Sequence, residues 1–174
     1  MPEDFTITLA RKDDVPKLEA LVNSAYRGES SRKGWTTEAD FLDGIRTNQE
    51  VLTGMVSRGD SVVLKCSDRN NNLLGCVYLQ KKEDKVYLGM LTVAPDIQAN
   101  GIGKKLLQAA EEYAETQDCI AITITVISLR KELIKWYERR GYKATGERKP
   151  FPSNDPRFGL PKRDLEFIVM EKQL

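Results

Sequence analysis

Residues 93–104 read VAPDIQANGIGK, and the elements on either side of this stretch define the fold. It joins an apolar segment to a run with helical spacing, through a loop that contains Gly101 and Gly103. Free backbone N–H groups and the positive end of a helix dipole converge at such a helix start, and glycines let the backbone approach an anion closely. With Lys104 or Lys105 adding positive charge, the stretch predicts a pyrophosphate site.

Two familiar phosphate-binding loops do not match this stretch. A P-loop requires a glycine five residues before the Gly-Lys pair and a Ser or Thr after it, where this chain has Gln98 and Lys105. A dinucleotide fingerprint requires a third glycine where Leu106 stands, inside a parallel βαβ unit. The strand before this loop instead ends a run of three antiparallel strands. A helix start without a ligand is the alternative interpretation.

Hydrophobic periodicity predicts the remaining elements. Strands are expected over residues 5–10, 61–66, 73–80, 86–93, 119–127, 142–147 and 164–170. Helices are expected over about 13–26, 48–56, 102–117 and 130–140, the last ending at Gly141. Thr37 to Asp40 is typical of a capping box, which predicts a further helix with Phe41, Leu42 and Ile45 inside it. Residues 148–163 are expected to form a loop.

This order of elements predicts one domain over residues 1–174 and an α/β fold of the mixed type. Its centre is a mixed, mostly antiparallel sheet with helices on both faces. Gly89, inside the expected strand 86–93, indicates a bulge or a close backbone approach. We find no internal repeat or linker that would divide the chain.

Composition narrows the function classes. The chain has 174 residues, with 27 Lys and Arg against 26 Asp and Glu, so its formal net charge is +1. Nucleic-acid binding is not expected without a denser basic field. Histidine is absent and no cysteine pair has ligand spacing, so we expect no metal site and no histidine-dependent catalysis. Cys66, Cys76 and Cys119 are expected to be reduced core residues.

The first residues lack the charged-then-apolar pattern of a signal sequence, so we expect no leader peptide, and no apolar run approaches the roughly 20 residues of a membrane helix. We therefore expect a cytoplasmic protein without a membrane partner.

Two motifs resemble those of the GNAT acyltransferase superfamily. Residues 98–103, QANGIG, are similar to its Arg/Gln-x-x-Gly-x-Gly/Ala signature and follow a Leu-x-Val-x-Pro strand end at 91–95. Residues 136–142, WYERRGY, resemble its Tyr-x-x-x-Gly-Phe/Tyr segment. The order of elements is also similar over nearly the whole chain. The resemblance implies the GNAT-type acyl-CoA N-acyltransferase fold.

The resemblance also implies a cosubstrate and a reaction. Acetyl-CoA would bind where the strands 86–93 and 119–127 splay apart, and its acetyl group would pass directly to a primary amine. The pantetheine arm would pair with Leu91, Thr92 and Val93. The pyrophosphate would contact Gln98, Ala99, Asn100, Gly101, Ile102, Gly103 and Lys104. Tyr137 matches the family tyrosine that protonates the leaving thiolate, since a phenol stays protonated at neutral pH. A backbone N–H near Leu91 or Thr92 would stabilise the oxyanion.

The general base has no clear candidate in the sequence. A glutamate early in the central strand is one familiar solution, but residues 86–90 read VYLGM. Deprotonation of the amine would therefore run through water, use Glu29 or Glu38, or need no dedicated base.

The resemblance also implies an acceptor pocket built by the first two helices with their connection and by the last hairpin loop. Here these segments supply Tyr26, Arg27, Glu29, Trp35, Glu38, Phe151 and Arg157. For Trp35 and Phe151, a role in hydrophobic packing is as good an interpretation as a role in binding the acceptor. Residues 148–163 hold five basic side chains against one acidic, Asp155, which favours a small amine that carries a carboxylate or phosphate and resembles an amino acid.

Other functions remain open at this stage. One alternative is an acyl-CoA sensor that transfers nothing; another is acetylation of a peptide or protein amine. A homodimer is possible, since dimers are common in the family.

Overall fold

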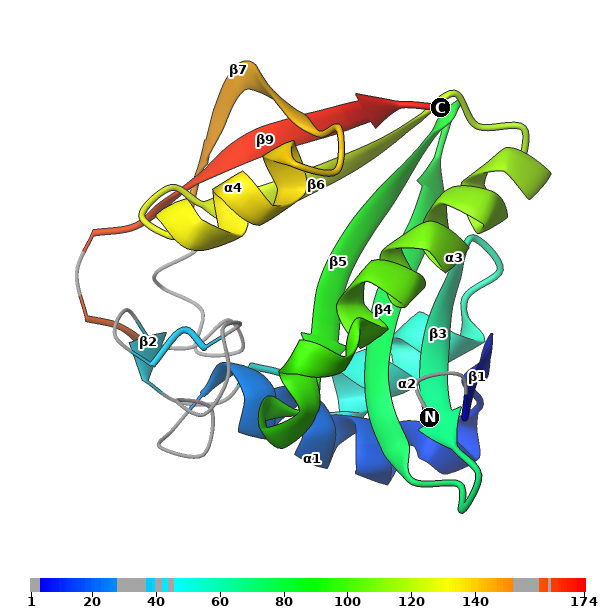
Figure 1. The fold of residues 1–174 in the computed structure, drawn as a ribbon. Helices are drawn as coiled ribbons and strands as arrows, with labels where there is room; N and C mark the ends of the chain where they lie inside the picture. Colours follow the sequence, from blue (N-terminus) through cyan, green and yellow to red (C-terminus); the bar gives the residue numbers. More distant parts are fainter. Residues whose placement is uncertain (1–3, 28–36, 40–41, 44–45, 152–159, 163) are drawn as a thin grey trace.

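The computed structural model describes residues 4–27, 37–39, 42–43, 46–151, 160–162 and 164–174. Its centre is a seven-stranded sheet with the order β1-β3-β4-β5-β6-β9-β7 (Figure 1). The strands are β1 (Phe5–Leu9), β3 (Ser61–Asp68), β4 (Leu73–Lys82), β5 (Lys85–Val93), β6 (Ala121–Ile127), β7 (Lys143–Pro150) and β9 (Glu166–Gln173). Neighbouring strands are antiparallel except for the central pair β5–β6, which is parallel.

Helices cover both faces of this sheet, as the sequence predicts (Figure 1). On one face, α1 (Val15–Tyr26) and α2 (Gln49–Ser57) bury Leu18 and Leu52 against β3, β4 and β5. On the other face, α3 (Ile102–Thr116) and α4 (Lys131–Glu138) enclose a second core that contains Leu106 and Ile122. Within the described residues, no helix is long and apolar enough to cross a membrane.

The two central strands pair over only part of their length. The register runs from Lys85↔Ala121 to Leu88↔Ile124 and then stops, so β5 and β6 diverge beyond it (Figure 1). At the same point β5 shifts register against β4 and Met90 takes a φ of 55°. The sequence predicted a bulge at Gly89, and the structure confirms one that begins at the next residue, Met90. The extra residue of a bulge bends its strand, which fits the divergence of β5 from β6 at this point.

The helix expected after the capping box is wrong. The Thr37 hydroxyl accepts a hydrogen bond from the Ala39 N–H (3.1 Å), two residues on, which is a Ser/Thr turn rather than a helix cap. Leu42–Asp43 is a short strand, β2, that pairs with β8 (Leu160–Pro161). Lys162 Nζ also donates to the Ala39 carbonyl (2.7 Å). These contacts join segments more than 100 residues apart, so local spacing could not reveal them; residues 40–41 and 44–45 lie outside the described part.

The loop expected over residues 148–163 is also partly wrong, since β7 extends to Pro150 and β8 lies within it. The pairing of β7 with β9 resumes at Arg148 after a register shift that contains Gly146, whose φ is 91°. Gly141 has a φ of 96°, as expected after the end of α4. All three cysteines are free and buried, in agreement with their core interpretation.

Candidate active site

Tyr26 connects the last turn of α1 to the bulge in β5. Its hydroxyl donates a hydrogen bond to the Leu91 carbonyl, and only 6% of the residue is exposed. Burial raises the pKa of Tyr26 to about 12, so the phenol remains a donor at neutral pH. This hydrogen bond therefore holds the bulge of β5 against the end of α1.

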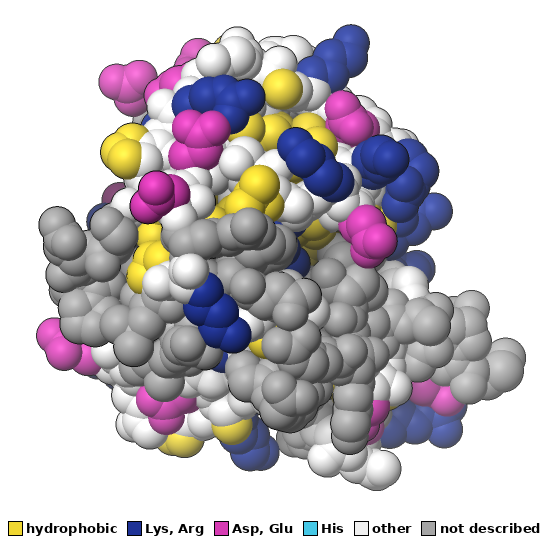
Figure 2. Space-filling model, turned by 90° about the vertical axis from the view of Figure 1, so that its left-hand side faces the viewer, with side chains coloured by type: hydrophobic (Ala, Val, Ile, Leu, Met, Phe, Trp, Pro, Cys, Tyr) yellow, Lys and Arg dark blue, Asp and Glu magenta, His cyan; other side chains and the backbone are white. Residues whose placement is uncertain are grey.

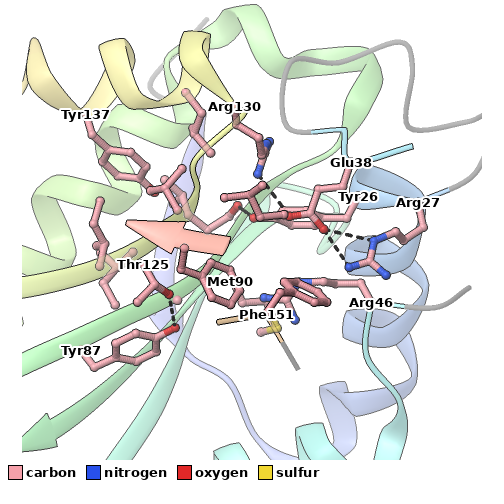
Figure 3. A pocket seen from close by; sticks show the side chains of 18 residues that line it. Tyr26, Arg27, Glu38, Arg46, Tyr87, Met90, Thr125, Arg130, Tyr137 and Phe151 are labelled. Carbon is pink, nitrogen blue, oxygen red and sulfur yellow. Dashed lines mark hydrogen bonds and ion pairs between the residues drawn. The ribbon is translucent and has the colours of Figure 1, made fainter. Parts of the chain in front are cut away.

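A cavity of about 200 Å³ lies where β5 and β6 diverge (Figure 3). Its strand walls are residues 87–91 of β5 and 124–127 of β6. Aromatic side chains from α1, α4, β9 and the residue after β7 close it, and its charged lining residues lie just after α1, just before α4 and in the segment between α1 and α2. These side chains are Tyr26, Tyr137, Phe151, Phe167, Arg27, Glu38, Arg46 and Arg130. The cavity is therefore assembled from residues far apart in the chain.

Glu38 lies between two buried arginines in this cavity. Arg27 donates Nε (3.1 Å) and Nη2 (2.8 Å) to one carboxylate oxygen, and Arg130 Nη1 lies 3.3 Å from the other. All three side chains are less than 10% exposed. Burial lowers the pKa of Arg27, although Glu38 opposes this effect. Both oxygens of this carboxylate therefore face guanidinium groups.

Tyr137 lies on α4 at the other side of the cavity (Figure 3). Its ring packs edge-to-face against Trp136 (5.0 Å between centroids) and Tyr142 (5.5 Å). Within the described part of the chain its hydroxyl makes no hydrogen bond, and burial raises the pKa of Tyr137 far above the usual range. A protonated phenol without a partner at the strand divergence is well suited to donate a proton or a hydrogen bond.

The glycine loop precedes α3 as a short 3-10 segment, η3 (Pro95–Asn100), which contains Gln98 and Ala99. Gly101 follows with a φ of 77° and is the N-cap of α3, so no side chain caps this helix. A Cβ at Gly101 would meet nothing within 4 Å. Ile102 and Gly103 are buried, whereas Lys104 is exposed. Open space, a positive φ and an uncapped helix start together fit an anionic group such as the CoA pyrophosphate.

The structure brings six of the predicted site residues together around the cavity. Tyr26, Arg27, Glu38, Leu91, Tyr137 and Phe151 all line the cavity. Thr92 and Val93 are buried in β5 next to it, and the Thr92 hydroxyl donates to the Met90 carbonyl (2.8 Å). Glu29, Trp35 and Arg157 lie outside the described residues.

Several lining residues were missed by the sequence reasoning. Tyr87 and Thr125 face each other across the strand pair, with their hydroxyl oxygens 3.3 Å apart. Alternation along the two strands could have indicated both. Arg46 and Arg130 carried no local signal, because they reach the cavity only through tertiary packing. In the portion of the chain described, no three acidic or cysteine side chains converge as metal ligands.

The surface toward which the strands diverge is mixed in character. Hydrophobic side chains gather there, surrounded by both acidic and basic side chains (Figure 2). The visible part of this face therefore carries no broad field of one sign, such as a nucleic-acid surface requires.

Comparison with known proteins agrees with this geometry. Residues 18–142 match the acetyltransferase (GNAT) family. The ribosomal-protein-S18-alanine N-acetyltransferase from Escherichia coli is similar in structure, with 15% identity, a TM-score of 0.70, and 97% of this chain and 93% of that chain covered. A chimera of the spermidine N-acetyltransferase SpeG from Vibrio cholerae has 16% identity, a TM-score of 0.72, and coverage of 98% and 96%.

A third similar structure was solved with the cosubstrate. It is a putative streptothricin acetyltransferase from Bacillus anthracis in complex with acetyl coenzyme A, with 17% identity, a TM-score of 0.57, and coverage of 69% and 66%. At these identities the structures show a shared fold only.

The chain belongs to the acetyltransferase (GNAT) family, since the family match spans most of its length. It is therefore an acyltransferase whose family chemistry uses acetyl-CoA and an amine.

Proposed function

We propose that this chain, as one domain, transfers an acetyl group from acetyl-CoA to a primary amine of a small molecule within a ternary complex. The observation that carries the proposal is the single cavity at the strand divergence, which joins Tyr137 on one side to a polar cluster around Glu38 on the other. A lined cavity of about 200 Å³ suits a small amine and the end of a thioester arm. It suits a folded protein substrate less well.

The thioester arm would lie against the part of β5 that β6 leaves unpaired. The pantetheine amides would run beside the backbone of Leu91 to Val93 in a strand-like arrangement, since the pairing of β5 with β6 ends at Leu88. The pyrophosphate would lie at residues 98–104, where the N–H groups at the start of α3 favour an anion.

The reaction requires one bond to form and one to break. The amine nitrogen forms a bond to the acetyl carbon, and the bond from that carbon to sulfur breaks. As that bond breaks, the Tyr137 hydroxyl, which its raised pKa keeps protonated, passes its proton to the sulfur, and the proton that the attacking nitrogen loses as the amide forms restores the tyrosine. A backbone N–H near Leu91 or Thr92 would stabilise the charge that develops on the carbonyl oxygen.

The amine must lose its ammonium proton before it attacks. Because Glu38 is engaged by Arg27 and Arg130, we assign this proton to water rather than to Glu38. The expected consequence is that kcat/KM rises with pH up to the pKa of the amine itself. A lower apparent pKa, lost in Glu38→Gln, would show instead that Glu38 is the base.

Tyr137→Phe tests the proton donor. We expect kcat to fall by about 100-fold to 10,000-fold while acetyl-CoA affinity is unchanged, since only the hydroxyl is removed. Tyr142→Phe is the matched control: its ring packs on Tyr137, its hydroxyl donates to Glu111 (3.2 Å), and it does not line the cavity. Unchanged turnover in Tyr137→Phe would remove this residue from the mechanism. Acetyl-CoA binding without turnover of any amine would favour the sensor alternative.

Gly101→Val tests the pyrophosphate loop. Acetyl-CoA at 100 times its Kd stabilises the folded state by about 2.7 kcal/mol, which raises the unfolding midpoint by roughly 5–10 °C in a domain of this size. We expect Gly101→Val to lose this shift. Gly146→Val is the control, because Gly146 also has a positive φ (91°) and open space at Cβ but lies on β7. A full shift in Gly101→Val would place the pyrophosphate elsewhere.

A further inference from the structure

Arg46 is held in place by α1, although it lies outside any helix. The Asn23 side-chain oxygen accepts hydrogen bonds from the backbone N–H groups of Arg46 (2.7 Å) and Thr47 (3.0 Å). The Asn23 amide in turn donates to the Thr47 carbonyl (3.0 Å). One side chain thus fixes the backbone of two consecutive residues. The start of the Arg46 side chain is therefore anchored to the helix that also carries Tyr26.

The guanidinium group of Arg46 extends from this anchor toward the cavity (Figure 3). Its Cζ atom lies 5.3 Å from the centre of the Tyr26 ring. The hydroxyl of the same tyrosine donates to the Leu91 carbonyl at the strand divergence. A group bound by Arg46 would therefore lie one tyrosine side chain away from the position of the thioester.

Arg46 differs from the other two arginines of the cavity in its partners. Arg27 and Arg130 both face Glu38, which is the only carboxylate among the described lining residues. Among the side chains that the structure describes, which exclude those of residues 40–45, no carboxylate lies within ion-pair distance of Arg46. A partly buried guanidinium group with no anionic partner is costly unless a ligand supplies one.

We propose that Arg46 binds a carboxylate group of the acceptor, so that the acceptors are small primary amines that carry a carboxylate. This inference rests on the proposed acetyl transfer and names its substrate class. The planar fork of a guanidinium group matches a carboxylate with two parallel hydrogen bonds. The described lining of the cavity holds three guanidinium groups and one carboxylate, and this excess of positive charge also disfavours polycationic amines.

The assignment refines the expectation drawn from the basic segment 148–163. Arg27 faces Glu38 inside the cavity, and Arg157 lies outside the described residues. Arg46 is the arginine whose position supports recognition of an acidic acceptor.

Matched acceptor pairs test the substrate class. Each amino acid is compared with its own amide at equal concentrations of free amine: L-alanine, L-phenylalanine, β-alanine and 4-aminobutyrate, with 1,4-diaminobutane as a dication. CoA release is measured with acetyl-CoA saturating. We expect kcat/KM for at least one carboxylate to exceed that of its amide by about tenfold or more, since hydrogen bonds to charged groups are strong.

Arg46→Gln tests the residue itself. For the preferred carboxylate, KM should rise by about tenfold to a hundredfold, while KM for acetyl-CoA and the rate with the amide stay within about threefold. Arg46→Lys should recover part of the loss, because the charge returns without the fork. Arg58→Gln is the control, since Arg58 is exposed and pairs with Asp60 away from the cavity. Unfolding midpoints of all variants identify any loss caused by misfolding.

The outcomes separate this inference from the proposed function. If amides or the diamine are acetylated as well as the carboxylates, or if Arg46→Gln affects both members of a pair equally, the carboxylate assignment is overturned and acetyl transfer stands. If the protein binds acetyl-CoA but acetylates no amine, the proposed function fails first.

Discussion

Neutralising Glu38 removes the only negative charge among the described residues of the cavity lining. In Glu38→Gln the shape of the side chain is kept, but Arg27 and Arg130 lose a charged partner. The exposed fraction of the side chain is 9% for Glu38, 4% for Arg27 and 7% for Arg130. Water therefore has little access to compensate for the lost charge.

The size of the effect follows from this burial. Breaking a buried ion pair by removing one partner costs about 3–5 kcal/mol. Glutamine keeps one oxygen that still accepts from a guanidinium group, so we expect the lower end, about 3 kcal/mol. For a domain of this length, each kcal/mol lowers the midpoint by about 2–4 °C. The midpoint of thermal unfolding should therefore fall by roughly 6–12 °C.

Calorimetry or circular dichroism at neutral pH provides the measurement. The control is Glu166→Gln: Glu166 pairs with Arg148, but these side chains are 46% and 60% exposed. An exposed pair contributes about 0–1 kcal/mol, so the midpoint should fall by no more than about 4 °C.

Equal midpoints for Glu38→Gln and Glu166→Gln would refute the reasoning that burial makes the Glu38 cluster a structural support. A Glu38→Gln protein with unchanged stability but an altered pH–rate profile would point to proton transfer instead.

Two further predictions concern packing and pH. Gly75→Ala should lose about 1–3 kcal/mol of unfolding free energy, because a Cβ there would lie 2.6 Å from the Thr92 carbonyl oxygen; Gly54→Ala, with nothing within 4 Å in α2, should gain about 0.5–1 kcal/mol. Urea titration measures both, and equal midpoints would contradict this packing. Burial would raise the pKa of Asp14, but a backbone N–H and Lys65 Nζ (2.9 Å) hold it below its usual value. A carboxylate whose folded-state pKa is depressed contributes stability above its unfolded-state pKa, and this contribution is lost as pH falls through the folded-state pKa. Asp14→Asn should therefore cost about 1 kcal/mol at pH 7, and the cost should disappear as pH falls through the folded-state pKa. A deficit that persists in acid would argue for a role other than charge.

Local spacing predicted most of the sheet and its helices. The alternation in β1, the helical stripe of α3 and the glycine after α4 were all visible in the chain, because each depends on neighbours a few residues away. The bulge in β5 was indicated by Gly89 for the same reason. The two motifs that predicted acetyl-CoA chemistry are local as well.

The capping-box prediction failed because Thr37 had two local uses that the sequence could not distinguish. Its hydroxyl can cap a helix or close a turn, and pairing of β2 with the distant β8 decided for the turn.

The sequence by itself determined the order of the strands of the main sheet and of helices α1 to α4, and the places of Gly101 and Tyr137 among them. Only the tertiary structure decided the composition of the cavity. Glu38 is 11 residues from Arg27 and 92 residues from Arg130 in the chain, yet the three side chains form one buried cluster. Arg46 reaches the same cavity through a side-chain contact from α1. Periodicity records which face of an element is buried, but charges meet across elements only when the elements pack, and that packing depends on the whole chain.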